Sequence, residues 1–303
     1  MKNENEISTI HCPICEGSLE QTGLVVKDYT VSGELFNLLE CATCTLRITE
    51  NAPDEAHIGK YYQADTYISH SNTTKSFLGL IYKAVRSRTL KKKATIIKEF
   101  TKKQTGALLD IGSGVGSFAA SMQTAGWQVQ AIEPDAGARA KAKELYNLNA
   151  EPLSLLESIE AESLDAITMW HVLEHVHKLH QTMANIKRAL APQGCIFIAV
   201  PNYTSGDAAY FQQFWAGYDV PRHLYHFSPQ SMEILAAKHG LEIVKLLPMW
   251  YDSYYVSLLS TKYKFGKMKY LKAFIQGLAS NRRAKLDVRF CSSIIYVMRK
   301  KCK

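Results

Sequence analysis

The segment that most constrains the fold is GALLDIGSGVGSFAASMQTAGWQVQAIEPD, residues 106–135. Residues 107–111 and 128–132 are short apolar runs of the kind that form buried strands. Between them lie a glycine-rich turn and a helix-forming stretch that ends at Gly126. An acidic residue, Glu133, follows the second run directly. This order predicts a β-α-β unit of a parallel sheet, with a ligand bound at its first turn.

The spacing of the loop is D-x-G-x-G-x-G, formed by Asp110 and the three glycines up to Gly116. A nicotinamide or flavin loop would place its third glycine at position 117, which is Ser117. The loop instead resembles motif I of the class I S-adenosylmethionine-dependent methyltransferases. In that family a carboxylate like Asp110 helps to position the methionine end of the cofactor, and one like Glu133 accepts hydrogen bonds from the ribose hydroxyls. The resemblance implies a cofactor-binding set made of Asp110, Gly112, Ser113, Gly114, Gly116, Glu133, Pro134, Trp170 and His171.

Later segments extend this resemblance. Apolar runs at 163–170, 190–202, 241–249 and 292–300 predict further strands. A helix is expected over 228–240, with Ser228 as N-cap, Pro229 at its first position and Gly240 at its end. The resemblance implies an α/β, Rossmann-like sheet of seven strands in the order 3-2-1-4-5-7-6, with only the last strand antiparallel. We place this methyltransferase domain at 105–303, with a helical insert at 251–288.

The stretch MWHVLEHVHKLH, residues 169–180, contains the H-x-x-E-H pattern of a class of zinc peptidases in His171, Glu174 and His175. Such a site needs both histidines on one helical turn, whereas a strand is expected to run up to His171. We therefore expect no peptidase site here. The segment resembles the turn after strand four in ubiquinone-pathway O-methyltransferases, where a Glu-x-x-Glu-His cluster is associated with a divalent metal. His171 stands here in place of the first glutamate.

That resemblance makes His175 and Glu174 candidate catalytic residues. His175 could deprotonate an acceptor hydroxyl or carbon acid near neutral pH. The alternative is that Glu174 and His175 brace the following helix against strand five.

A second group of side chains lies in FWAGYDVPRHLYHFSP, residues 214–229, where the family builds its substrate contacts. Trp215 and Tyr218 could form an apolar or stacking wall, and Arg222 could hold a phosphate or carboxylate. His223, a candidate catalytic residue, or His226 could handle a proton. The alternative is structural: Asp219 pairs with Arg222, and His226 caps a turn.

Four cysteines occur as two C-x2-C pairs, Cys12 with Cys15 and Cys41 with Cys44, separated by 25 residues. Two such knuckles can present four thiolates to one zinc ion, so residues 1–55 resemble a zinc-ribbon module. A pair of disulfides is the alternative, which a cytoplasmic location disfavours. Because protein ligands fill all four positions, we expect the zinc to be structural.

The formal charge of +8 is concentrated toward the C-terminus, where residues 261–303 hold 13 Lys and Arg against the single acid Asp287. Residues 56–104, expected to form a helical bridge, are also basic. These stretches predict either solvated helix faces or an anionic partner. The insert at 251–288 could be a lid or dimer contact, a membrane-surface helix, or simply a packed helix. The polar start of the chain and the lack of any long apolar run predict a cytoplasmic protein with no transmembrane segment.

The function implied by the resemblance is S-adenosylmethionine-dependent methylation of a small-molecule acceptor at oxygen or carbon. The acceptor is expected to be anionic and either sugar- or lipid-linked, since an N-terminal zinc module also precedes the methyltransferase domain in sugar C-methyltransferases. The alternative is a zinc-ribbon methyltransferase acting on ribosomal RNA bases. Against RNA, the end of strand four reads MWHV, not the N-P-P-Y type used on exocyclic amines. The oligomeric state stays open.

Overall fold

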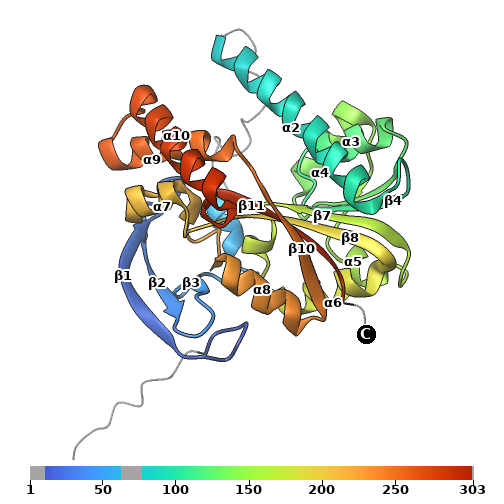
Figure 1. Cartoon of the computed structure of the whole chain (residues 1–303), viewed down its shortest axis with the longest axis horizontal. Coiled ribbons are helices and arrows are strands. Elements are labelled where there is room, and N and C mark those ends of the chain that lie inside the picture. The colour runs from blue at the N-terminus through green and yellow to red at the C-terminus, as the bar shows by residue number, and fades with distance from the viewer. Residues whose placement is uncertain (1–10, 63–76, 302–303) are drawn as a thin grey trace, which may run out of the picture.

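The computed structural model describes residues 11–62 and 77–301. Its centre is a seven-stranded sheet in the order β10-β11-β8-β7-β4-β5-β6, in which β11 runs antiparallel to both neighbours (Figure 1). This is the predicted order 3-2-1-4-5-7-6, so the expectation for the sheet is confirmed. The strands are β4 (Ala107–Ile111), β5 (Gln128–Ile132), β6 (Ala150–Glu151), β7 (Leu164–Trp170), β8 (Leu190–Pro201), β10 (Leu241–Pro248) and β11 (Ser293–Lys300).

Helices cover both faces of this sheet, as its fully buried central strands require. Ile97 of α2 and Met122 of α3 pack on one face, against Phe197 and Val297. The other face is covered by α6 and α8, with Met183 and Leu235 in its core. The helices of this layer arrangement are α2 (Phe77–Thr101), α3 (Ser117–Thr124), α4 (Ala136–Tyr146), α5 (Leu155–Ser158), α6 (Leu179–Ala189) and α8 (Pro229–Lys238).

β4 and β7 are parallel neighbours, but the order in which the chain adds strands to the sheet reverses between them. From β4 the chain proceeds outward to β5 and β6, and then returns to β7 on the other side of β4. The carboxyl ends of β4 and β7 therefore border a crevice, which is where ligands bind in open α/β sheets. The glycine loop and the segment after Trp170 both lie at this edge.

The cysteine-bearing segment forms a second sheet of four strands, β1 (Leu19–Lys27), β2 (Leu35–Cys41), β3 (Arg47–Thr49) and β9 (Tyr225–His226). The fourth strand comes from a distant part of the chain, because Arg47 of β3 pairs with His226 of β9. Thr45 Oγ1 also lies 2.6 Å from Ser228 Oγ, and the Tyr203 hydroxyl donates to the Thr45 carbonyl over 2.6 Å. The N-terminal module is thus joined to residues 203–228 by a shared sheet and by side-chain hydrogen bonds.

Helical segments occupy the described parts of the predicted bridge and of the predicted insert, and residues 63–76 of the bridge lie outside the described residues. Along the chain, the 3-10 turn η1 (Ile58–Tyr62) and the long helix α2 come between β3 and β4. The insert is a helical hairpin of α9 (Asp252–Phe265) and α10 (Tyr270–Leu286), which packs on α7 (Gly206–Phe211). The short 3-10 turns are η2 (Leu173–His175), η3 (Gln212–Phe214), η4 (Ala216–Tyr218) and η5 (Val288–Phe290). Within the described residues, none of the helices has the length and apolar character needed to cross a bilayer.

Candidate active site

The glycine loop after β4 is shaped for close approach by a ligand. Gly112 and Gly114 have φ angles of +69° and +55°, which favour glycine. A Cβ atom at Gly112 would collide with the Val172 side chain, so only glycine fits at this position. At Gly114, by contrast, a Cβ would meet no described atom within 4 Å. The Ser113 hydroxyl beside it is buried and has no hydrogen-bond partner among the described residues. The loop therefore offers open space and an unused polar group.

Two carboxylates flank the loop, as the sequence predicts. Glu133, at the end of β5, accepts the Gly114 N–H over 2.8 Å and the Asp135 N–H over 2.9 Å. Asp110, at the end of β4, is fully buried and accepts the Thr168 hydroxyl over 2.6 Å. Burial raises the pKa of Asp110 to about 7. Pro134 lies exposed beside Glu133 and its carbonyl accepts Arg139 Nη1 over 2.7 Å.

Trp170, the last residue of β7, forms one wall of the same edge. Its ring meets Phe118 edge-on at 5.3 Å between centroids, and Lys93 Nζ lies 4.1 Å from the centre of its ring. Lys93 comes from α2, and its charge faces Asp110 and Asp252. Burial lowers the pKa of Lys93 to about 8. The sequence did not single out Lys93, because a lysine within a basic helix looks like any solvated side chain.

His171 occupies a left-handed turn, with φ of +58°, directly after β7. Its Nε2 lies 3.1 Å from Asp252 Oδ2 of α9, and its Nδ1 lies 3.5 Å from Glu174 Oε1. Burial alone would lower the pKa of His171, but the two carboxylates outweigh burial and raise it to about 9. His171 is thus an imidazolium held between two acids. The following turn, η2, is a 3-10 turn, and α6 begins only at Leu179. The helical geometry of the H-x-x-E-H peptidases is therefore absent from this segment.

Glu174, His175 and His223 converge beside this turn. One ring nitrogen of each histidine and a carboxylate oxygen of Glu174 lie within 4.8 Å of one another. Glu174 is fully buried, and neither carboxylate oxygen has a hydrogen-bond partner among the described residues. Burial alone would raise the pKa of Glu174, but the His171 ring, 3.5 Å from its Oε1, and the nearby His223 ring hold it below its ordinary value. A carboxylate and two imidazoles also form a donor set that a divalent cation could take.

The tautomers of both histidines follow from their partners. His175 Nδ1 lies 2.9 Å from the Arg222 carbonyl, and His223 Nδ1 lies 2.9 Å from the Gly217 carbonyl. A carbonyl only accepts, so both Nδ1 atoms carry a proton. The Tyr62 hydroxyl lies 3.0 Å from His175 Nδ1 as well. Burial lowers the pKa of His175 to about 4, with a further contribution from His223, so its ring is neutral at pH 7.

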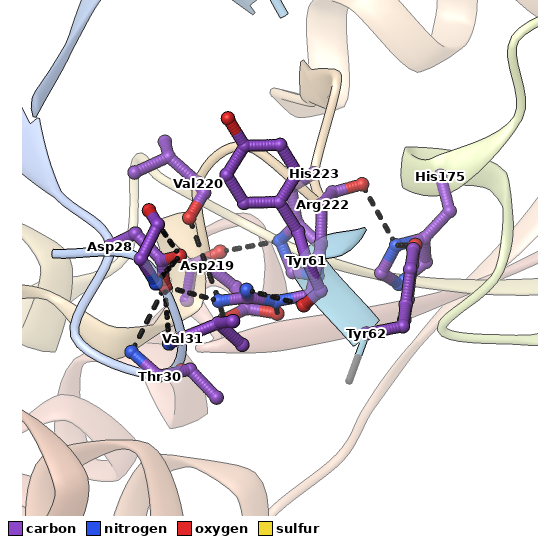
Figure 2. Close-up of polar contacts among 12 residues, drawn as sticks. Asp28, Thr30, Val31, Tyr61, Tyr62, His175, Asp219, Val220, Arg222 and His223 are labelled. Carbon is purple, nitrogen blue, oxygen red and sulfur yellow. Dashed lines mark hydrogen bonds and ion pairs between the residues drawn. The ribbon is translucent and has the colours of Figure 1, made fainter. Parts of the chain in front are cut away.

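Arg222, expected as an anion-binding residue, lies inside the protein (Figure 2). Its guanidinium donates to Asp28 over 3.0 Å, to Asp219 over 2.6 Å and to the Tyr61 carbonyl over 3.0 Å. Only 1% of its surface is exposed. The pairing with Asp219 matches the structural alternative drawn from the sequence. Since protein groups occupy the guanidinium, Arg222 positions its neighbours and does not present a free cation to a substrate.

The other three substrate candidates are also buried. Trp215 donates to Asp207 over 2.8 Å, and the Tyr218 hydroxyl accepts Arg47 over 2.8 Å. His226 Nε2 lies 3.1 Å from Thr49 Oγ1. These contacts join residues 214–228 to β3 and α7, so the three side chains support the loop that carries His223. In this structure they do not line an open wall.

Comparison with known proteins agrees with this arrangement. Residues 84–246 match the family model described as a methyltransferase domain. That match covers more than half of the chain.

The chain belongs to this methyltransferase family.

Solved structures similar to this methyltransferase include two from microbial sources. One is a SAM-dependent methyltransferase from Archaeoglobus fulgidus, with 16% identity over 74% of this chain and 100% of the other, and a TM-score of 0.49. The other is 1,6-didemethyltoxoflavin-N1-methyltransferase from Burkholderia thailandensis, with 13% identity over 86% and 98% of the two chains, and a TM-score of 0.46. None of the curated proteins matches this chain.

The four cysteines of the methyltransferase meet at one point outside this cleft. Cys12 Sγ lies 3.4 Å from Cys44 Sγ, and Cys15 Sγ lies 3.3 Å from Cys41 Sγ. All four sulfur atoms lie within 4.8 Å of one another, and three of the four residues are buried. None of these cysteines forms a disulfide. Four convergent thiols of this spacing fit a tetrahedral zinc site with no vacant position.

Proposed function

We propose that this protein is an S-adenosylmethionine-dependent methyltransferase acting on a hydroxyl or carbon acid of a small molecule. The observation that carries the proposal is the placement of the glycine loop, Glu133 and a neutral His175 after the carboxyl ends of β4, β5 and β7, at one edge of the sheet. The family match supports methyl transfer, and the crevice geometry supports this cofactor. The zinc ion held by Cys12, Cys15, Cys41 and Cys44 belongs to the same proposal.

The loop fits the cofactor on features of its own. The open space above Gly114 admits a ligand against bare backbone, and the buried Ser113 hydroxyl lacks a partner among the described residues. Glu133 would accept the ribose hydroxyls, and Asp110 would hold the methionine ammonium end. Trp170 and His171 would border the methionine side. The Lys93 ammonium, facing the same edge, suits the methionine carboxylate.

When bound, S-adenosylmethionine supplies a methyl group on a positively charged sulfur, which is already reactive. The protein therefore needs mainly to align the acceptor with that methyl group, and alignment can lower a barrier by several kcal/mol. His175 then takes the acceptor proton on Nε2, while its Nδ1–H stays on the Arg222 carbonyl. The carboxylates of Glu174 and Asp219 stabilise the imidazolium that results. His223 helps to hold Glu174 from the other side.

The proposal is tested by calorimetric titration with S-adenosylmethionine and S-adenosylhomocysteine, using zinc-loaded protein. Binding of both at one site per chain is expected. No binding by folded protein would refute it. Radiolabelled methyl transfer to cell extracts, separated into metabolite, lipid and RNA fractions, then locates the acceptor. Label in RNA that falls with rising salt would support the RNA alternative. Titration of divalent cations into zinc-loaded wild type and into a Glu174→Gln variant tests whether Glu174, His175 and His223 hold a second metal.

A further inference from the structure

A groove of about 650 Å³ lies between α2 and α10, at the edge of the proposed active site. Five basic side chains line it, and no acidic side chain does: Arg88, Lys91, Lys92, Arg282 and Lys285. All five are exposed. None forms an ion pair with an acid in the described parts of the chain, although Lys103, Lys238 and Lys300 elsewhere do. A group of unneutralised cations in a concave surface is an anion-binding feature.

The groove borders the active site through two elements. On α2, one face of the helix presents Arg88, Lys91 and Lys92 to the groove, while Lys93 turns to Trp170. On the other side, Trp250 and Tyr251 line the groove. The next residue, Asp252, holds His171. The groove and the methyl-transfer crevice therefore share α2 and the segment 250–252.

The helix α10 continues the groove as an apolar surface. Residues 271, 275, 278, 282 and 285 share one face, since they recur every three to four residues. The last two are the basic groove residues Arg282 and Lys285, and Leu278 lines the groove beside them. Toward the tip of the hairpin the same face carries Ile275, 51% exposed, and Leu271, 75% exposed. Phe274 next to them is 56% exposed. One face of α10 therefore carries exposed cations, unpaired within the described residues, at one end and exposed apolar side chains at the other.

Beyond Asp252, its first residue, the α9–α10 hairpin carries no acidic side chain. From Ser253 to Leu286 the sequence contains eight Lys and Arg and no acidic residue. Figure 1 shows the α9–α10 hairpin projecting from the same end of the molecule as the first half of α2. Exposed apolar side chains surrounded by lysines are the pattern of a segment that lies on an anionic membrane surface. RNA would use the cations but not the apolar tip.

We propose that the acceptor is a lipid that bears a phosphate group. The phosphate binds in the groove between α2 and α10, and its hydrocarbon chain lies along Leu271, Phe274 and Ile275 at a membrane surface. This inference rests on the proposed methyl transfer, because it takes the ligand of the groove to be the acceptor. It adds the chemical class of that acceptor and the place from which it is drawn.

The test is flotation of zinc-loaded full-length protein with vesicles. Vesicles of phosphatidylcholine with added phosphatidic acid are compared with vesicles of phosphatidylcholine alone. Binding to the phosphatidic acid vesicles only is expected. Two variants separate the parts of the site: Arg282→Gln with Lys285→Gln, and Leu271→Ser with Ile275→Ser. The basic pair should weaken binding roughly 25-fold, from about fivefold for each charge near an anionic surface. The apolar pair should weaken binding at least about tenfold.

Matched controls use side chains of the same kind outside the groove. Lys143→Gln with Lys245→Gln removes two exposed charges, and Leu145→Ser removes an exposed leucine. Both control variants should bind vesicles like the wild type. Calorimetric titration of every variant with S-adenosylhomocysteine should give unchanged affinity.

Equal binding to both vesicle types, or binding to neither, would overturn the inference, as would controls that fall as far as the groove variants. Loss of vesicle binding on adding soluble nucleoside diphosphate or RNA, which would then occupy the groove, would also overturn it. A failure of the proposed function looks different. In that case S-adenosylhomocysteine fails to bind while vesicle binding persists.

Discussion

The carboxylate of Asp28 and the guanidinium of Arg222 meet 3.0 Å apart, with 0% and 1% of their side chains exposed. Asp28 directly follows β1 of the cysteine-bearing module, and Arg222 lies in the loop that supports the proposed base. The Arg222 carbonyl in turn accepts a hydrogen bond from His175 Nδ1 (Figure 2). The N-terminal module is thereby connected to the proposed catalytic histidine through a single residue.

Breaking this ion pair should destabilise the protein. Arg222→Met leaves the buried carboxylate of Asp28 without its cation, and such a loss costs about 3–5 kcal/mol. Asp28→Asn should cost less, because Asp219 still pairs with the guanidinium. Urea unfolding monitored by circular dichroism measures both. If Arg222→Met were as stable as wild type, Arg222 would not be the link between the two parts of the chain.

The same pair predicts a dependence of stability on pH. Burial alone would raise the pKa of Asp28, but the hydrogen bonds from Arg222 and from the Ser32 and Thr30 N–H groups hold it below 3.8. A carboxyl group with a lowered pKa stabilises the fold above its unfolded pKa of about 4. This contribution is lost as the pH falls below that value. Thermal unfolding from pH 7 to pH 3 should show a smaller decrease in Asp28→Asn than in wild type. Parallel curves would contradict the prediction.

Glu133→Gln should weaken binding of S-adenosylhomocysteine about 10- to 100-fold, since hydrogen bonds to a charged group contribute about 1.5–3 kcal/mol. Calorimetric titration gives the affinity directly. Glu133 accepts the Gly114 and Asp135 N–H groups on separate oxygens, so Gln keeps one of these two hydrogen bonds, and circular dichroism checks that the fold is retained. Glu151→Gln, at the neighbouring strand end, serves as the control and should bind like wild type. Equal affinities in all three proteins would remove Glu133 from the cofactor site.

His175→Gln should lower the rate of methyl transfer about 10²- to 10⁴-fold, the usual contribution of a general base. Cofactor affinity should change little, because the ring contacts Arg222 and Tyr62 and not the glycine loop. Single-turnover transfer of labelled methyl groups measures the rate. His177→Gln is the matched control, because the His177 Nε2 lies 3.0 Å from the Pro53 carbonyl and the residue is not part of the Glu174, His175 and His223 cluster. A variant with full activity would exclude His175 as the base.

Removal of zinc should unfold the N-terminal sheet. Cys44→Ser deletes one of four convergent ligands, and Cys44 is fully buried. One zinc ion per wild-type chain is expected by elemental analysis, with little or none in the variant. Because β9 pairs with β3, loss of the metal should also expose residues 225–226 to hydrogen exchange. A metal-free wild-type protein with an intact sheet would refute the structural role of zinc.

The local patterns of the sequence determined the cofactor loop and six strands of the large sheet, all except the short β6, whereas the strand order followed from the family resemblance. Each of these six strands and the D-x-G-x-G-x-G turn depend on residues close together in the chain, where backbone preference and burial act directly. The same holds for the C-x2-C pairs and for α8, whose Ser228 cap is observed as expected. These features could be predicted because neighbouring residues alone specify them.

Only the tertiary structure decided the roles of Arg222, His226 and Lys93. Arg222 finds its partner Asp28 across 194 positions, and His226 lies in a sheet with β3, 177 positions from its partner Thr49. Asp252 reaches His171 from the insert, which sets the charge of that histidine. Whether a charged side chain binds a ligand or stabilises the fold depends on the groups that pack against it. That environment arises only when distant segments of the chain are brought together, since burial and charge pairing are properties of the folded protein.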